Sequence, residues 1–539
     1  MTRLQLTPLP LSVLCTRARA LNKSLKGKGR KITNNKGWLL LPFLLFALTP
    51  LLQAQIEPRT PPVRVEDALR FGRTDVFGSA RFFGTGGSMT AIGVDATTLH
   101  TNPAGIGWNR FSAAQITPGF ALNNLTARLR NGEGNEETEE TKGTFVVPSA
   151  SLVWAGDTRS LNWSTFNFGI SYTRLADFNE TIVYDGRSEG GIIDAVVEDL
   201  NDRRDNPDLG LNFPFRANLA QQIPNAVQLD DLGFFSDFDL ESSLGGEIRR
   251  NGRVERSGSL NEIALGFGGN YMEKVLWGVT IGIPTIDFTE TKVYDEVDDR
   301  DEITFFDNAG FDELLELSGS GVNFKLGLIG RPTDNIRISA AVHSPTFWTV
   351  DEVYETTFEY NFTDNGQAQG GTELSPRSEA AYNLRTPWKF HLGAGYLFSN
   401  KGFLSVDADY SNLAGTAFSS DDFATVDIAG NADVDRELEG MLGVRLGGEL
   451  NLKPFQVRAG VGYRQNPLVF LRNGEDGANI NLSGGLGYSA GKFFIDAAVR
   501  LEDNSAYYAP YTTFGFDGQV VDTDRNRISS VLTVGFRGF

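Results

Sequence analysis

Cysteine, histidine and methionine are all scarce in this chain, and their scarcity limits the chemistry it can perform. Cys15 is the only cysteine of the 539 residues, and there are three histidines and four methionines. A single thiol excludes both a disulfide within the chain and a cluster of thiolate metal ligands. Low thiol content suits an oxidising envelope compartment. We expect neither a metal site nor a cofactor.

Positive charge is also in short supply outside the first residues. The formal net charge is −19, which argues against a nucleic-acid partner. Residues 1–54 are the exception, because they contain several lysines and arginines and no acidic residue. We therefore treat this segment separately from the rest of the chain.

Long apolar runs are absent except for one, Trp38–Leu52, with the sequence WLLLPFLLFALTPLL. This run is shorter than the roughly 20 apolar residues that a membrane-spanning helix needs. It follows a basic stretch and precedes Gln53-Ala54-Gln55, which is the pattern of a secretory signal peptide. We expect residues 1–54 to be a basic leader and signal peptide, cleaved after Ala54.

The sequence after about Phe111 alternates with a period of two. Between 166 and 172, and again between 322 and 328, apolar residues alternate with polar residues or glycine. This pattern predicts strands with one apolar face, and glycine on the polar face leaves room inside a curved sheet. A soluble β-sandwich also alternates, so the pattern alone does not identify the architecture.

The lengths of the connections favour a transmembrane barrel. We predict about 14 strands, and the links between them alternate between short turns and long loops. Short turns at one rim and long loops at the other are the plan of an outer-membrane barrel. The predicted fold is therefore an all-β, antiparallel transmembrane barrel over residues 111–539, with 186–256 as its largest extracellular loop. The strands are predicted at 111–130, 144–156, 162–185, 257–272, 275–294, 318–331, 336–360, 380–398, 402–414, 437–452, 454–466, 478–490, 492–503 and 526–539.

The charged stretches of the predicted loops need their own interpretation. Residues 133–140 (EGNEETEE) and 296–302 (EVDDRDE) are strongly acidic. We interpret them as solvated parts of the extracellular loops rather than as ion sites.

The segment that precedes the barrel does not alternate. Residues 63–110 are rich in glycine and other small residues, and Asn102-Pro103 is a turn signal. This composition is typical of a compact coil with short helical turns. We expect residues 55–110 to form an N-terminal extension and a plug, or hatch, inside the lumen of the barrel.

Several short motifs of this segment resemble the hatch of the long-chain fatty acid transporter (FadL/TodX) family. They are Ser79-Ala80, Gly84-x-Gly86, Asp95-Ala96 and Asn102-Pro103-Ala104-Gly105. The sequence is similar in style to members from the Bacteroidetes. In this family a hatch precedes a 14-stranded barrel, and the resemblance assigns hatch or gating roles to Gly84, Gly86, Asp95, Asn102, Pro103 and Ala104.

The resemblance also implies a function and a location. It implies passive uptake of hydrophobic small molecules, such as long-chain fatty acids or aromatic hydrocarbons, through the Gram-negative outer membrane. The extracellular loops would capture the ligand, and a shift of the hatch would open a route, sideways through the wall. The other expected partners are outer-membrane lipid, lipopolysaccharide, and the barrel-assembly machinery that reads a last strand ending in Phe539.

The largest loop contains the candidate ligand contacts. Apolar residues clustered in an exposed loop suggest a binding site, although they would also serve to pack the loop onto the barrel rim. The candidates in the loop are Phe213, Phe215, Ile223, Phe234, Phe235 and Phe238.

The alternatives to a transporter are an enzyme, a barrel without transport, and an open diffusion porin. We do not expect an enzyme, because the chain has no Gly-x-Ser-x-Gly elbow and no His-Glu-x-x-His motif. Asp407 and Asp409 should both face the lumen, where solvated lining is the simplest role for them. The second alternative is a barrel without transport, which acts as an adhesin or an envelope scaffold.

Overall fold

The computed structural model describes most of the chain after its first 64 residues. The described ranges are 65–130, 135–158, 160–195, 226–228, 234–236, 247–303, 306–364, 366–374, 377–420, 424–469, 477–511 and 519–538. The predicted signal peptide and residue Phe539 lie outside them.

Antiparallel strands form one sheet that closes on itself, because β21 pairs with β1. Four wall positions are each built from two consecutive segments, β3 with β4, β10 with β11, β13 with β14, and β15 with β16. Counted this way, the wall has 14 strands, which confirms the predicted number and fold class. The strands are β1 (Ala113–Leu129), β2 (Thr138–Asp157), β3 (Trp163–Asp177), β4 (Glu180–Ser188), β7 (Ile248–Tyr271), β8 (Val275–Val297), β9 (Phe306–Gly330), β10 (Ile336–His343), β11 (Phe347–Asp364), β13 (Ser378–Arg385), β14 (Lys389–Leu397), β15 (Gly402–Asn412), β16 (Ala417–Ser419), β17 (Gly440–Leu452), β18 (Phe455–Arg464), β19 (Asn479–Ala490), β20 (Phe493–Tyr508) and β21 (Val521–Arg537).

Three further strands lie outside the wall. Strand β12 (Gln367–Leu374) forms a hairpin with β11, and β5 (Ala226–Gln228) pairs with β6 (Phe234–Ser236) in a separate small sheet. The short 3-10 helix η6 (Leu413–Gly415) lies between β15 and β16, and helix α8 (Ala424–Glu437) follows β16.

The alternating pattern places apolar side chains on the outer face of the wall. Phe267, Ile281 and Leu326 are 45–55 % exposed, and similar residues recur on neighbouring strands. A band of exposed apolar side chains of this size is unfavourable in water and favourable against lipid. Closure of the sheet satisfies every strand edge, as a lipid environment requires. The chain is therefore a transmembrane β-barrel.

In the described part of the chain, no helix is long and apolar enough to cross a membrane.

The strands extend further on the long-loop side than we predicted. Strands β7 and β8 pair continuously from Tyr271–Val275 to Arg249–Val297, so the predicted start of a strand at 257 and the predicted end at 294 are wrong. The extension is rich in arginine and glutamate, whose cross-strand pairs support a solvated sheet. A high density of charged residues predicts a loop, but here the charged residues belong to strands that continue beyond the apolar band.

The prediction that the acidic stretch 296–302 is a solvated loop is wrong for its first residue. Glu296 belongs to β8, is fully buried, and accepts a hydrogen bond from Arg250 Nε at 3.1 Å. Likewise, 138–140 of the other acidic stretch belongs to β2. These carboxylates stabilise the folded outer end of the barrel.

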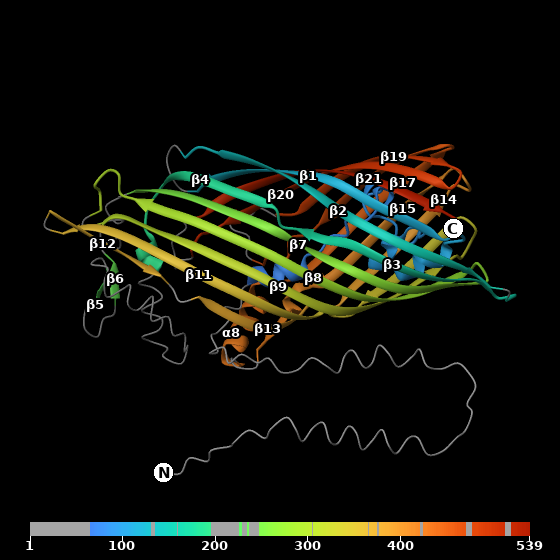
Figure 1. Ribbon diagram of the computed structural model, residues 1–539, viewed down its shortest axis with the longest axis horizontal. Coiled ribbons are helices and arrows are strands. Elements are labelled where there is room, and N and C mark those ends of the chain that lie inside the picture. Colours follow the sequence, from blue (N-terminus) through green and yellow to red (C-terminus); the bar gives the residue numbers. More distant parts are fainter. Residues whose placement is uncertain are drawn as a thin grey trace, which may run out of the picture. The chain divides into compact units, whose positions relative to one another are not determined.

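The segment before β1 lies within the cylinder, near the end that carries the C terminus (Figure 1). It consists of α3 (Val65–Gly72), α4 (Ala80–Gly84), and the 3-10 helices η1 (Ala96–His100) and η2 (Pro103–Trp108). Nearly all of 77–108 is buried, and these elements contact strands on several sides of the wall. We refer to residues 65–108 as the plug.

Candidate functional site

Three of the short helices of the plug, α4, η1 and η2, are each preceded by a residue whose side chain caps them. Ser79 accepts a hydrogen bond from Phe82 N, Asp95 accepts one from Thr97 N, and Asn102 accepts one from Ala104 N. Such caps satisfy backbone donors that a short helix otherwise leaves free. Ser79 Oγ also donates to Asp95 Oδ2 at 2.6 Å, so the caps of α4 and η1 are joined.

Asn102 connects the plug to the wall as well as capping η2. Its Nδ2 donates to the carbonyl of Thr90 at 3.0 Å and to the carbonyl of Leu328, on β9, at 3.3 Å. Pro103 follows in the first turn of η2, where its missing N–H costs nothing. The Asn-Pro-Ala motif therefore fixes both the local turn and the position of the plug against β9.

A belt of glycines on the inner face of the wall receives the plug. A Cβ on Gly278 would lie 2.3 Å from the carbonyl carbon of Pro103, and one on Gly460 would lie 2.3 Å from Gly86 N. Backbone or side-chain atoms of the plug lie in or against the space that a side chain would need at each of these positions, so a larger residue there would press on the plug. We call this set the glycine belt, and its members are Gly169, Gly266, Gly268, Gly278, Gly327, Gly393, Gly395, Gly447, Gly460 and Gly485.

Two of the motif glycines face this belt from the plug side. Gly84 lies at the end of α4, where a Cβ would be 3.2 Å from the Cα of Gly485. Gly86 has a φ of +65°, a left-handed conformation that residues with a side chain rarely adopt. Gly86 therefore requires glycine for its backbone conformation, and a side chain at Gly84 would press on the wall. Ala104 is fully buried, in a cluster with Trp108, Leu276 and Ile329.

Ion pairs add a second set of connections between the plug and the wall. Asp75 pairs with Arg464, and Arg81 Nε pairs with Glu449 at 2.8 Å. Burial alone would raise the pKa of Asp75, but the guanidinium groups of Arg464 and Arg445 hold this pKa below its usual range. Burial, together with nearby Arg525 and Arg464, lowers the pKa of Arg73 to about 10.

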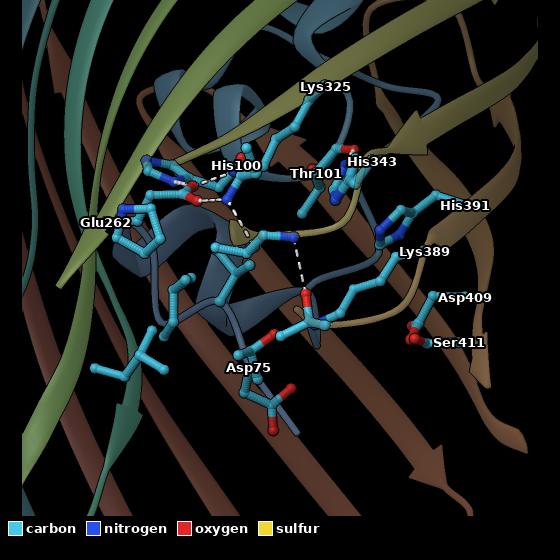
Figure 2. A pocket seen from close by; sticks show the side chains of 18 of the residues that line it. Asp75, His100, Thr101, Glu262, Lys325, His343, Lys389, His391, Asp409 and Ser411 are labelled. Carbon is cyan, nitrogen blue, oxygen red and sulfur yellow. Dashed lines mark hydrogen bonds and ion pairs between the residues drawn. The ribbon is translucent and has the colours of Figure 1, made fainter. Parts of the chain in front are cut away.

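A cavity of about 90 Å³ lies between the plug and the wall. Its polar lining includes His100 and Thr101 of the plug, together with Glu262, Lys325, His343, Lys389, His391 and Asp409 of the wall (Figure 2). Figure 2 shows that these side chains, which come from distant parts of the sequence, point toward the same space.

The same cavity has an apolar side. Phe71 of α3 packs edge-on against Trp348 of β11, with ring centroids 5.1 Å apart, and Leu175, Leu260 and Met441 lie beside them. These residues belong to a larger buried cluster that holds α3 against the wall. Such a combination of an apolar wall and a few polar groups is typical of small-molecule sites.

On the outer face of the wall, a hollow of about 740 Å³ lies across strands β18 to β21 and β1. Its floor contains Gly484 and Gly485, and its rim carries exposed apolar residues such as Phe120 and Phe145. At Gly485 only the backbone of the wall separates this floor from Gly84 of the plug.

The ladder around β1 is interrupted next to this hollow. Ile116 and Gly119 of β1 pair with β21, but Thr117 and Pro118 between them do not, so two pairs are missing. The register of β1 with β2 shifts at the same place. A proline removes a ladder hydrogen bond and weakens the pairing of a strand. Thr533, opposite this gap, accepts a hydrogen bond from Ala80 N of the plug at 2.7 Å.

The predicted loop contacts are not tested by these observations. Phe213, Phe215, Ile223 and Phe238 lie outside the described residues. The backbones of Phe234 and Phe235 belong to β6, but their side chains are not described.

Neither lumen aspartate lines open solvent: Asp407 binds the plug, and Asp409 pairs within the wall. Asp407 Oδ2 accepts a hydrogen bond from Thr90 N at 2.9 Å, and Asp409 pairs with Arg445. Sequence reasoning placed both on the inner face correctly but did not reveal their partners, because those partners are remote in the sequence. Within the described residues, no group of three or more His, Cys, Asp or Glu side chains is arranged to hold a metal ion.

Fold and site together define a transmembrane β-barrel whose lumen contains a closely fitted N-terminal plug. No family model matches the chain, and no curated protein matches it. Solved structures that it resembles include a Pseudomonas aeruginosa FadL homologue, with 15 % identity, a TM-score of 0.49, and coverage of 86 % of this chain and 98 % of that one. The P. putida toluene transporter TodX has 11 % identity and a TM-score of 0.49, and the match covers 86 % of this chain and 99 % of that one. The Ralstonia pickettii toluene transporter TbuX has 11 % identity and a TM-score of 0.46, and the match covers 86 % of this chain and 100 % of that one.

These structures carry names from the family that the hatch motif resembles. With identities and TM-scores this low, the description of the barrel rests on the strand pairing of this chain itself.

Proposed function

We propose that the protein is a channel of the Gram-negative outer membrane for passive uptake of hydrophobic small molecules. The observation that carries the proposal is the plug, which fills the lumen by backbone contact with the glycine belt and leaves a partly apolar cavity above it. A closed barrel that only scaffolds the envelope does not need a separate, capped segment fitted in this way.

The route begins at the extracellular loops and continues into the lumen. A ligand captured by the loops reaches the apolar side of the cavity, where Phe71 and Trp348 offer aromatic contact. Residues Gly84, Gly86, Asp95, Asn102, Pro103 and Ala104 act as the hatch, because they set the position of the plug against the wall. Long-chain fatty acids and aromatic hydrocarbons are the ligand classes to test first.

We place the exit at the outer hollow beside Pro118. An apolar solute gains free energy when it leaves water for lipid, and the hollow offers an apolar surface on the lipid side of a weakened strand pairing. The hydrogen bond from Ala80 N to Thr533 connects the plug to this part of the wall. Movement of α4 would therefore loosen the wall next to the hollow.

Uptake measurements test the proposal directly. Cells with and without the protein are given labelled fatty acids and aromatic hydrocarbons, and we expect faster uptake of at least one compound with the protein. Replacement of Gly485 by Leu should obstruct the narrow wall beside Gly84 and reduce uptake. Gly330→Leu, at the end of β9 and outside the hollow, serves as the matched control, because a Cβ there meets only the Ile338 side chain at 3.5 Å. Equal uptake by all strains across the panel would refute a transport role.

A second candidate function, a closed scaffold or adhesin, is favoured by the ion pairs of the lumen. Around a second cavity of about 270 Å³, Arg256 bridges Glu180 and Glu290, and Arg527 pairs with Asp177. Such a network stiffens the barrel. Failure of every compound in the uptake panel, with normal surface display, would support this alternative.

A further inference from the structure

All three histidines of the chain meet at the junction between the plug and the wall. His100 belongs to η1, His343 to β10 and His391 to β14, and all three line the same cavity (Figure 2). The ring centroids of His343 and His391 are 4.4 Å apart. Convergence of every imidazole at one internal contact suggests a role that depends on protonation, because histidine is the side chain that titrates near neutral pH.

Two of the histidines join the plug to the wall immediately before the Asn-Pro-Ala motif. His100 Nδ1 lies 2.7 Å from Glu262 Oε1 of β7, and His343 Nε2 lies 2.7 Å from the carbonyl oxygen of Thr101, to which it donates. Thr101 directly precedes Asn102. The histidines therefore hold the same turn that Asn102 attaches to β9.

The surroundings leave little capacity for additional positive charge. Lys325 of β9, Lys389 of β14 and Arg445 of β17 already supply cations to the cavity. Of the carboxylates, Glu262 is engaged by Lys325, Asn323 and His100, and Asp409 by Arg445. Asp75, which comes from the plug, is paired with Arg464.

The rings of His100 and His343 are buried, whereas His391 is partly exposed to the cavity. His100 Nε2 and His391 Nε2 are buried and have no hydrogen-bond partner within the described structure. Burial lowers the pKa of His100 despite its hydrogen bond to Glu262. A protonated ring in this small space would lack a free counter-charge, since the carboxylates that line the cavity are already paired.

We propose that the histidine cluster is an acid-sensitive latch, which holds the plug in place at neutral pH and releases it when the pH falls. The inference rests on the proposed function only in that the plug must close the barrel, and it does not depend on the ligand. Displacement of the plug admits water, so that His343 and His391 take up protons that the closed state excludes.

The sign and size of the effect follow from linkage. The closed state is fully favoured above the ordinary histidine pKa of about 6.5 and becomes less favoured as the pH falls through that value. One unit below it, each histidine that is protonated only in the open state raises the open-to-closed ratio roughly tenfold. For two such residues the ratio rises roughly a hundredfold.

Conductance of the purified chain in planar bilayers tests the latch. We expect little current at pH 7.5 and a large increase at pH 5.5, with a midpoint between about pH 5.5 and 6.5. The double variant His343→Gln/His391→Gln should stay closed at both values, because an amide can still donate to the Thr101 carbonyl but takes up no proton. A variant that lacks residues 65–108 should conduct at both values, which separates failure of the latch from absence of a plug.

Controls keep the result decisive. Heat-modifiable migration in gels reports whether each variant forms the barrel. A wild-type current that does not change between pH 7.5 and 5.5, or an equal response in the double variant, would overturn the proposal. If the double variant does not fold, a wild-type midpoint below pH 4 overturns it instead, since that range belongs to carboxylates.

Discussion

The glycine belt makes a quantitative prediction about how firmly the plug is held. In Gly278→Ala the new methyl group would lie 2.3 Å from the carbonyl of Pro103, and in Gly460→Ala it would lie 2.3 Å from Gly86 N. The atoms in the way are backbone atoms of the plug, which cannot rotate aside. Overpacking of this kind costs about 1–3 kcal/mol.

This overpacking free energy destabilises only the closed state, because in the open state the plug has moved away from the wall and no longer meets the methyl group. A cost of about 2 kcal/mol raises the ratio of open to closed barrels roughly 30-fold. The two sites lie on distant strands, β8 and β18, so their effects should add in the double variant. We expect both single variants to raise the conductance in planar bilayers at pH 7.5, and the double variant to raise it further.

The matched control is Gly484→Ala on β19, where the nearest atom is the Arg458 carbonyl oxygen at 3.9 Å. This variant adds the same methyl group to a glycine of the wall without meeting the plug, so its conductance should equal that of the wild type. If all three single variants conduct equally, close packing of the plug against the belt does not hold it, and the reasoning fails.

Three further predictions concern the plug. Asn102→Ala removes a helix cap and two hydrogen bonds to carbonyls, which together are worth about 2 kcal/mol. It should raise conductance more than Asn102→Ser, which keeps an uncharged cap acceptor, and equal currents would contradict this order. Because the pKa of Asp75 is lowered, its contribution to plug binding is complete above about pH 4 and is lost progressively below it. In the His343→Gln/His391→Gln background the current should stay flat from pH 8 to 5 and rise only in stronger acid, and Asp75→Asn should reduce this remaining rise, to which the Arg81–Glu449 pair also contributes. Phe71→Ala should loosen α3 by about 3–5 kcal/mol, seen as a red shift of Trp348 fluorescence, whereas an unchanged spectrum would mean that α3 is held by other contacts.

The sequence was sufficient to predict the wall of the barrel. Alternation between Phe166, Phe168 and Ile170 and their polar neighbours sets which face meets lipid, because successive side chains of a strand point to opposite sides. Alternating short and long connections gave the number of strands, and the terminal pairing of β1 with β21 agrees with it. These features are local in the chain, so a single sequence contains them.

Prediction failed where polarity no longer marks the end of a strand. Glu296 and Arg250 occur in charged stretches, but they are buried against each other at the outer end of the barrel. Their burial depends on a partner that is 46 residues away in the sequence. Phe71 and Trp348 of the cavity were missed because they, too, are far apart in the sequence. The phenylalanine in the short apolar stripe of α3 was nevertheless a signal that this segment is a packed helix.

The sequence by itself determined the closed sheet and the presence of a glycine-rich segment before it, because periodicity and composition act through nearest neighbours in the chain. Only the tertiary structure decided which glycines of the wall meet which atoms of the plug, and that His100, His343 and His391 share one cavity. Those contacts depend on the shear of the closed sheet, which brings residues hundreds of positions apart to the same height in the barrel.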